Sequence, residues 1–250
     1  MPFLTEARGP DDLRLYAIGD VHGRLDLLRE THARIGRDLA ARPCPAFRIV
    51  HLGDYIDRGP DSAGVVERLI EVGRDGDSVC LAGNHDLLVP AFLSDPEEAG
   101  DFWMTYGGEE TLASYGVDPL SPALRAAPWT ALRDAFAAAL PEAHRRFFGA
   151  LPFAERHGDF LFVHAGLRPG RPVEAQTARD LTFIREPFLS FEGDLGVVVV
   201  HGHTIVEAPD IRPNRVGIDT GAWRSGRLTT FVVEGGETGF LTDGGYDPLV

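Results

Sequence analysis

Polar side chains that can bind a metal ion follow several separate apolar runs of this sequence. They are Asp20 and His22 in GDVHG, Asp54, Asp57 and Arg58 in GDYIDRG, Asn84 and His85 in GNHD, His164 in HAG, and His203 in HGHT. A mixed nitrogen and oxygen ligand set without sulfur favours manganese, iron or zinc. Because a carboxylate with ligands on both sides can bridge two ions about 3.5–4 Å apart, the pattern predicts a dinuclear site.

Each motif alone has a plainer interpretation. A single Gly-Asp after a strand is an ordinary turn, and His164 alone is as well explained as a hydrogen-bonded histidine at a strand end. Three motifs in order, separated by roughly thirty residues, are not explained as unrelated turns. His201 stays open between lining the site and a structural role. The remaining histidines that we considered are expected to be structural or solvated: His32, His51, His144 and His157.

The spacing of apolar residues predicts the elements that bring the motifs together. Strands are expected within 13–20, 47–54 and 78–86, with helices over 25–40 and from Asp61 onward, where Asp-Ser supplies an N-cap. Such βαβ units favour a parallel sheet with ligands outside the carboxyl ends of its strands. Further short strands are expected within 159–166, 195–204, 214–221 and 227–235. The tail LTDGGYDPLV has no period, and we expect it to be loosely held.

The middle of the chain differs in residue composition from both ends. From about 95 to 155 the sequence is rich in helix-forming residues and aromatics, so we expect a helical cap inserted into a single domain that covers 1–250. Within this cap, Tyr106-Gly107-Gly108 is either a turn that anchors a helix or a contact with substrate. The shape of the cap is not readable from its composition.

The motifs together resemble the signature set of the calcineurin-like metallophosphoesterase superfamily, and specifically its phosphoprotein phosphatase branch with small bacterial members. The resemblance runs from about Arg14 to Val233. It implies an α/β fold, a four-layer sandwich of two mixed β-sheets flanked by helices, with the helical cap inserted. It also implies a dinuclear metal centre between the sheet ends, manganese being the favoured metal and iron or zinc the alternatives.

The resemblance also implies a role for each motif residue. Asp20 and His22 would hold the first metal, Asp54 would bridge, and the second metal would be held by Asn84, His164 and His203. His85 would be the general acid, oriented by Asp57. Arg58, and Arg185 in LTFIREPF, would bind the phosphate.

The same chemistry can be argued from phosphate esters themselves. Their oxygens repel a nucleophile and their alkoxide leaves poorly. Two divalent ions would supply a bridging hydroxide for direct in-line attack, and the forked donors of Arg58 and Arg185 fit the phosphoryl oxygens. His85 lies one residue beyond Asn84, so it can face the leaving group and protonate it, with Asp57 raising its pKa. No covalent phosphoenzyme is required.

Two departures from the family pattern bear on the substrate. The chain has GNHD where eukaryotic protein phosphatases usually have GNHE, and GNHD also resembles the bacterial diadenosine tetraphosphate hydrolases. Those hydrolases typically replace the Asp of the DRG triplet, whereas Asp57-Arg58-Gly59 is intact here. Because we give the triplet more weight than the GNHD motif, we expect a phosphomonoesterase that acts on a phosphorylated protein or peptide. The expected class is a serine/threonine protein phosphatase, with dual specificity as an open variant. The alternative is a diadenosine tetraphosphate hydrolase, and a metal-binding interaction module without catalysis is a third hypothesis.

Composition excludes several other functions. All 24 basic residues are Arg, so Schiff-base, pyridoxal phosphate and P-loop chemistry are excluded, because each needs a lysine. A net charge of −14 argues against a nucleic-acid partner. Cys44 and Cys80 are too few for a disulfide scaffold, and no apolar run of about 20 residues predicts a membrane span. With no apolar targeting segment near its start, the chain is expected to be cytoplasmic and free of membrane partners.

Overall fold

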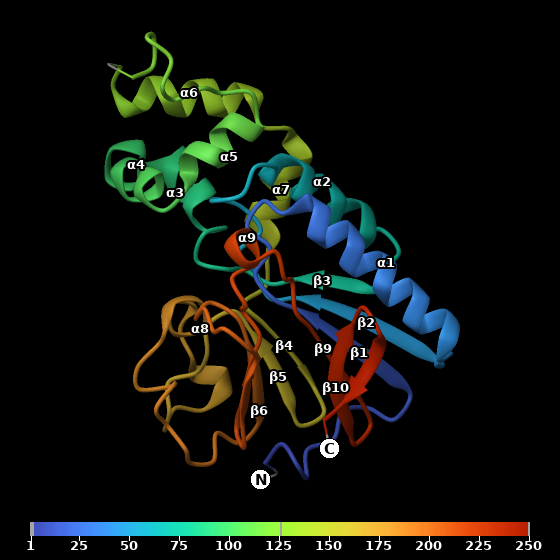
Figure 1. Ribbon diagram of the computed structural model, residues 1–250. Helices are drawn as coiled ribbons and strands as arrows, with labels where there is room; N and C mark the ends of the chain where they lie inside the picture. The colour runs from blue at the N-terminus through green and yellow to red at the C-terminus, as the bar shows by residue number, and fades with distance from the viewer. Residues whose placement is uncertain (1–2, 126, 250) are drawn as a thin grey trace.

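Short apolar runs rich in Val, Ile, Leu and Phe form the strands of two β-sheets (Figure 1). The structure, a computed structural model, describes residues 3–125 and 127–249. One sheet has the order β11-β10-β9-β1-β2-β3, with strands β1 (Leu13–Ile18), β2 (Ala46–His51), β3 (Ser78–Cys80), β9 (Thr230–Glu234), β10 (Glu237–Thr242) and β11 (Gly245–Pro248). The other has the order β4-β5-β6-β8-β7, with strands β4 (Ala154–His157), β5 (Phe160–Val163), β6 (Val198–His201), β7 (Asp210–Arg212) and β8 (Arg215–Gly217).

Both sheets are mixed. In the first sheet, β1, β2 and β3 run parallel, and β9 pairs antiparallel with β1. In the second, β5, β6 and β8 run parallel, flanked by antiparallel β4 and β7. Parallel strands connected by helices are covered on both faces, so they consist of nearly continuous apolar runs. The predicted fold class of two mixed sheets flanked by helices is confirmed.

β1 shows how one strand contributes to two apolar cores. Leu15 and Ala17 belong to a buried cluster between the sheets, whereas Tyr16 and Ile18 belong to the cluster beneath the helices. This division follows from the two-residue period of a strand, in which successive side chains point to opposite faces. β1 is therefore buried on both faces, and it holds the loop that follows it in a fixed position.

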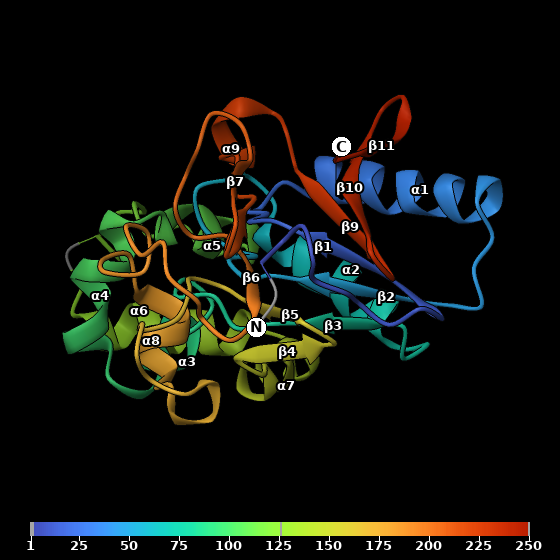
Figure 2. The same ribbon diagram turned by 90° about the horizontal axis from the view of Figure 1, so that it is seen from below.

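Helices cover the outer faces of the sheets (Figures 1 and 2). α1 (Leu25–Ala41) and α2 (Ser62–Gly73) lie against the first sheet. The Asp61 side chain accepts a hydrogen bond from the backbone N–H of Gly64, as the predicted N-cap requires. α8 (Ala178–Phe183), preceded by the 3₁₀ turn Val173–Ala175, lies on the second sheet. These layers enclose three buried apolar clusters.

The chain between β3 and β4 is helical. It forms α3 (Leu88–Ser94), α4 (Pro96–Thr105), α5 (Gly108–Ser114), α6 (Trp129–Ala139) and α7 (Glu142–Ala150). Of these helices, α5 and α7 pack on α2, and the buried ring of Trp103 lies 5.0 Å from that of Phe92 and 5.5 Å from that of Phe136. In Figure 1 most of these helices lie above the sheets, as does the short helix α9 (Ala222–Ser225). None of the described helices is long and apolar enough to cross a membrane.

The expectation of a loosely held tail is wrong. β10 and β11 form an antiparallel hairpin that extends the first sheet, with Thr242 opposite Gly245. The two residues between them are Asp243 and Gly244, a turn sequence that favours a two-residue hairpin. Strands this short show little periodicity, so the turn was the stronger signal.

Candidate metal centre and phosphate pocket

The predicted site residues lie in loops that follow the carboxyl ends of parallel strands. Asp20 and His22 follow β1, Asp54 to Arg58 follow β2, Asn84 and His85 follow β3, and His164 and His203 follow β5 and β6. Parallel strands of one sheet end at the same edge, and the two sheets are packed so that these edges meet. The loops of both sheets therefore converge on one point.

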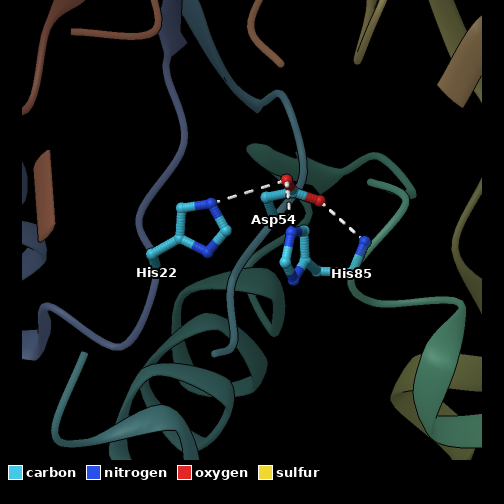
Figure 3. Close-up of side chains that lie close together, drawn as sticks. All are labelled: His22, Asp54 and His85. Carbon is cyan, nitrogen blue, oxygen red and sulfur yellow. Dashed lines mark hydrogen bonds and ion pairs between the residues drawn. The ribbon is translucent and has the colours of Figure 1, made fainter. Parts of the chain in front are cut away.

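Asp54 lies at the centre of this convergence. His22 and His85 point toward its carboxylate (Figure 3), with Nε2 of His22 3.5 Å and Nε2 of His85 3.9 Å from Oδ2. Nε2 of His164 lies 3.4 Å from Oδ1 of Asp54, and 3.1 Å from the amide oxygen of Asn84. The second carboxylate oxygen therefore faces a different imidazole from the first.

Two groups of possible metal ligands share this carboxylate. One is His22, Asp54 and His85, and the other is Asp54, His164 and His203; within each group the ligand atoms lie within 4.8 Å of one another. Nε2 of His203 is buried and has no hydrogen-bond partner among the described residues. A buried imidazole nitrogen without a partner is costly unless something else binds it. The donors therefore fit a pair of metal ions bridged by Asp54.

Backbone carbonyls orient two of the imidazoles for this task. Nδ1 of His22 donates to the carbonyl of Ile56 (2.7 Å), and Nδ1 of His164 donates to the carbonyl of Leu52 (3.0 Å). Each ring is thereby held with Nε2 facing Asp54, as is usual for metal-binding histidines. Burial also lowers the pKa of His22 and of His203 to about 3. Both rings are therefore neutral at pH 7, the form that binds metal.

Asp20 lies outside both ligand groups. Its carboxylate accepts the backbone N–H of His203, with distances of 3.0 and 3.3 Å to its two oxygens. Burial, together with the carboxylates of Asp219 and Asp54, holds the pKa of Asp20 well above its usual range. The predicted pairing of Asp20 with His22 on one metal stays a prediction, and in this geometry His85 is the third member of the first group.

His85 also belongs to a buried ion pair. Its Nδ1 donates to Oδ2 of Asp57 at 2.6 Å. Burial works to lower the pKa of His85, but the carboxylates of Asp54 and Asp57 outweigh it and raise the pKa above the usual value of 6.5. A histidine that keeps its proton near neutral pH can serve as a general acid. This geometry supports the predicted role of His85, with Asp57 as the partner that orients it.

Two arginines line a small cavity above Asp54. The cavity has a volume of about 120 Å³, and its polar lining includes Asp54, Arg58, Asn84, His85, Arg185 and His203. The Arg58 guanidinium lies against both imidazoles, with Nη1 2.9 Å from Nε2 of His22 and Nη2 2.9 Å from Nε2 of His85. Whereas Arg168 and Arg171 pair with Asp180, neither cavity arginine has an ion-pair partner among the described residues. Their charge is thus available to an anion, and their forked donors suit a phosphoryl group.

This arrangement can be compared with known proteins. The family model for calcineurin-like phosphoesterases matches residues 13–226. The chain belongs to this family. It is accordingly a hydrolase of the metallophosphoesterase class, and the family implies divalent metal ions at the site. Such ions, when bound, lower the pKa of a coordinated water and neutralise phosphoryl oxygens.

Curated relatives of this phosphoesterase include dinucleoside tetraphosphatases. An asymmetrical bis(5'-nucleosyl)-tetraphosphatase from Geobacillus is 25% identical over 242 residues, which cover 88% of this chain and 90% of the relative. A symmetrical bis(5'-nucleosyl)-tetraphosphatase from Nitrosomonas europaea is 31% identical over 78% of this chain and 62% of its own length. Among solved structures, a cold-active protein tyrosine phosphatase superposes with a TM-score of 0.64 at 17% identity, covering 95% of this chain and 80% of the other. At that identity the likeness shows the fold alone.

The site loops of this phosphoesterase have an unusual backbone. Among the described residues, every non-glycine residue with positive φ is a predicted site residue: His22 (44°), Asp54 (53°), Asp57 (72°), Arg58 (67°) and His203 (64°). Such conformations cost of order 1–3 kcal/mol each and persist where surrounding structure enforces them. The strain is therefore concentrated where the ligands must face one point.

Asp86, the last residue of GNHD, is one functional residue that sequence analysis did not assign. Its buried carboxylate accepts the backbone N–H groups of Asp54 (2.8 Å), Tyr55 (3.0 Å) and Gly83 (2.9 Å). Burial and the neighbouring Asp54 raise the pKa of Asp86 to about 7. Asp86 does not line the cavity. In this phosphoesterase it fixes the loop that carries Asp54, and it does not contact the substrate pocket.

The helical segment supplies two further residues that no local signal indicates. Nε1 of Trp103 and Oγ1 of Thr111 both donate to Oδ1 of Asp57, at 2.9 and 2.6 Å. Gly107, for which two roles were open, accepts the backbone N–H of Arg58 (3.3 Å), while its neighbour Tyr106 lines the cavity. The segment therefore fixes Asp57 and Arg58 in place as well as bordering the pocket.

The other histidines lie away from the cavity. His201 packs against Phe188, with ring centroids 5.1 Å apart, and it does not line the pocket. His32 and His51 face each other with 3.0 Å between their Nε2 atoms. His144 contacts Tyr115 and Glu67, and His157 contacts Glu155. These residues have structural partners, as expected for His32, His51, His144 and His157.

Proposed function

We propose that this phosphoesterase hydrolyses dinucleoside polyphosphates. The observation that carries the proposal is the small cavity with two unpaired arginines, in a chain whose relatives over nearly its full length are bis(5'-nucleosyl)-tetraphosphatases. At about 120 Å³ the cavity is well below the 300–1,000 Å³ typical of sites that enclose a whole organic ligand. It has room for a phosphoryl group, and the rest of the substrate lies outside it.

The residues of this chain would act as follows. Arg58 and Arg185 bind the oxygens of the attacked phosphoryl group, and Asp57 holds His85 with its Nε2 facing the cavity. Water adds to phosphorus in line with the departing oxygen and releases a proton to solvent. The P–O–P bond breaks, and the leaving group departs as a nucleoside phosphate anion. The metals are proposed to be held on the two sides of Asp54, one by Asp20 and His22 and the other by Asn84, His164 and His203, so that His85 stays free to act as an acid. Manganese is the first choice and iron or zinc are the alternatives.

A second candidate is the phosphoprotein phosphatase expected from the intact Asp57-Arg58-Gly59 triplet. The observation that favours it is the 2.6 Å bond between His85 and Asp57. A phosphoanhydride has a stable leaving group that departs without a proton, whereas the alkoxide of a phosphoserine or phosphothreonine needs a general acid. A histidine with a raised pKa is therefore more useful to ester hydrolysis than to anhydride hydrolysis.

Direct competition between two substrates tests the proposal. The protein is stripped of metal, reconstituted with manganese, and assayed for phosphate or nucleotide release from diadenosine tetraphosphate and from a phosphothreonine peptide. We expect kcat/KM to favour the dinucleotide by about a hundredfold or more, a difference of about 2.7 kcal/mol in transition-state stabilisation. A preference of about a hundredfold in the opposite direction, for the peptide, would assign the protein to the second candidate. Asp54→Asn serves as the control that any release comes from this site.

A further inference from the structure

Exposed aromatic side chains gather at the mouth of the phosphate pocket. Among the described residues, the exposed aromatic side chains are Phe3, Phe102, Tyr106, Phe183 and Trp223. Three of them, Phe102, Tyr106 and Phe183, line the cavity, and we call these three the aromatic rim. The ring of Trp223 lies 5.7 Å from the guanidinium carbon of Arg58. Large apolar surface left in water at one place is a common mark of a binding site.

The aromatic rim comes from two sides of the fold. Phe102 and Tyr106 belong to α4 and its C-cap, with ring centroids 4.6 Å apart and planes tilted by 43°. Phe183 is the last residue of α8. In Figure 1 α4 lies above α8 on the left-hand side of the molecule, and in Figure 2 both helices again lie on the left. The rim therefore offers ring faces on more than one side of the opening.

The rim also lies at a short distance from the reacting centre. The Tyr106 ring centroid is 6.4 Å from that of His85, and the Phe183 centroid is 6.5 Å from that of His203. Phe102 and Tyr106 are each 45% exposed, so their faces are available at the mouth and are not packed inside the cavity. A phosphoryl group held by Arg58 and Arg185 would leave the organic part of the substrate against these rings.

We propose that the aromatic rim is a nucleobase subsite, in which Phe102, Tyr106 and Phe183 stack against a base of the dinucleotide. This inference rests on the proposed function and names the part of the protein that recognises the base. Flat heteroaromatic bases stack on aromatic side chains without needing a particular hydrogen-bond pattern. The adjacent arginines bind the phosphates, so the site combines a stacking surface with an anion pocket.

A phosphotyrosine ring is the other flat group that the rim could receive. Its ring is attached directly to the phosphate oxygen, so it would lie closer to the phosphoryl group than a nucleobase does. A nucleobase is separated from its phosphate by a ribose, which carries it out to the half-exposed rings. Rings on two sides of the opening also suit a substrate that has two bases better than one with a single ring.

Inhibition by base-containing and base-free phosphates tests the subsite. The assay is the hydrolysis of nitrophenyl phosphate by the manganese-loaded protein, and the inhibition constants of AMP and ribose 5-phosphate are measured in it. These two inhibitors share the sugar and the phosphate and differ in the base. We expect AMP to bind more tightly by about 5-fold to 100-fold, the range that stacking of one base supplies.

Variants of the aromatic rim test whether the tighter binding of AMP comes from these rings. In the double variant Phe102→Ala, Tyr106→Ala the ratio of the two inhibition constants should fall toward one, because the stacking surface is gone while the arginines remain. Phe3→Ala is the matched control, since Phe3 is similarly exposed at 38% and lies outside the cavity lining. It should leave the ratio unchanged. Because Phe102 and Tyr106 are half-exposed, their removal leaves the buried core intact.

The outcomes separate the subsite from the proposed function. Equal inhibition by AMP and ribose 5-phosphate, or a ratio that survives the double variant, overturns the subsite even if the wild type cleaves diadenosine tetraphosphate. Tighter inhibition by phosphotyrosine than by AMP assigns the rim to aryl phosphates and also overturns it. A wild type that prefers AMP through the rim, yet leaves diadenosine tetraphosphate uncleaved, supports the subsite and removes the proposed tetraphosphatase activity.

Discussion

At the scale of single residues, Asp54 is the group on which the metal site depends. It is the member common to both ligand groups, and its carboxylate has imidazoles on both sides. Burial works to raise the pKa of Asp54, but the imidazoles of His164, His85 and His22 outweigh it and hold the pKa well below the usual range. The side chain is therefore an anion at neutral pH, which is the form that bridges two cations.

Asp54→Asn should abolish activity and lower metal content. An amide has no charge with which to bridge two cations, so both groups lose their shared ligand at once. We expect nitrophenyl phosphate hydrolysis to fall by at least about 10³-fold, equivalent to about 4 kcal/mol. Elemental analysis of the purified variant gives the metal content in parallel. An active variant that retains all its metal would contradict the central role of Asp54.

Asp57 is expected to act through His85, and its effect should be visible in the pH dependence of the rate. Since the Asp57 carboxylate helps to raise the pKa of His85, Asp57→Asn should lower that pKa. A general acid works below its pKa, so the alkaline decline of kcat should begin at a lower pH in the variant. The profile of phenyl phosphate hydrolysis measures this shift. An alkaline limb that stays in place would remove His85 from the acid role.

At the scale of elements, the helical segment between β3 and β4 does more than border the pocket. α4 contributes Trp103 and α5 contributes Thr111, and both donate to the same oxygen of Asp57. Both side chains are fully buried. Two donors on Oδ1 leave Oδ2 to accept from His85, so the helices set the direction in which the carboxylate faces. The orientation of the proposed acid is therefore coupled to the packing of α4 and α5.

Thr111→Val should show whether the Thr111 hydroxyl orients Asp57 for catalysis. Valine has nearly the shape of threonine but lacks the hydroxyl that donates to Asp57 at 2.6 Å. Because hydrogen bonds to charged groups contribute about 1.5–3 kcal/mol, we expect kcat for phenyl phosphate to fall by about tenfold or more. KM should change little, since Thr111 does not line the cavity.

Thr111→Ser is the matched variant, because it keeps the hydroxyl and removes only a methyl group. It should restore most of kcat if the hydrogen bond is what matters. If serine and valine lower kcat equally, or if KM rises instead, Thr111 has a packing role and does not orient Asp57.

At the scale of the whole molecule, the net negative charge affects the attraction of phosphate, and buried histidines affect how stability depends on pH. A net charge of −14 repels anions at long range, so the unpaired arginines and the metals must supply the local attraction for phosphate. Away from the site, His32 of α1 faces His51 of β2. Burial lowers the pKa of His32 to about 3 and that of His51 to about 4. The folded protein thus keeps this pair neutral.

The contribution of this pair to stability should therefore be lost in acid, in the metal-free protein. Below pH of about 6.5 the unfolded chain takes up protons at these histidines and the folded one does not, so each contributes a loss of up to about 1.4 kcal/mol per pH unit. Urea unfolding at pH 7, 6 and 5 measures the slope. His32→Leu removes one such group and should flatten the slope by about that amount. An unchanged slope would show that the pair is not the source.

Sequence alone predicted which residues meet at the strand ends. Apolar runs, turn residues and helix N-caps are local signals, and parallel strands bring the residues that follow them to one edge. Asp54, His22, His164, His203, Asn84, His85 and Arg58 were identified on that basis, and the structure places all of these around one centre. Asp20 was identified in the same way but lies outside both ligand groups. Arg185, which lines the cavity, was predicted from the family resemblance. The hairpin formed by β10 and β11 was missed because its strands are short and weakly periodic.

Only the tertiary structure decided which groups contact one another across long separations in the chain. Thr111 and Asp57 are 54 residues apart, and no periodicity or turn connects them. The aromatic rim joins α4 to α8, and Asp86 turns away from the pocket to bind the Asp54 loop. Such contacts follow from how side chains of distant elements fill shared space, which depends on the packing of the complete fold and not on any local pattern of residues.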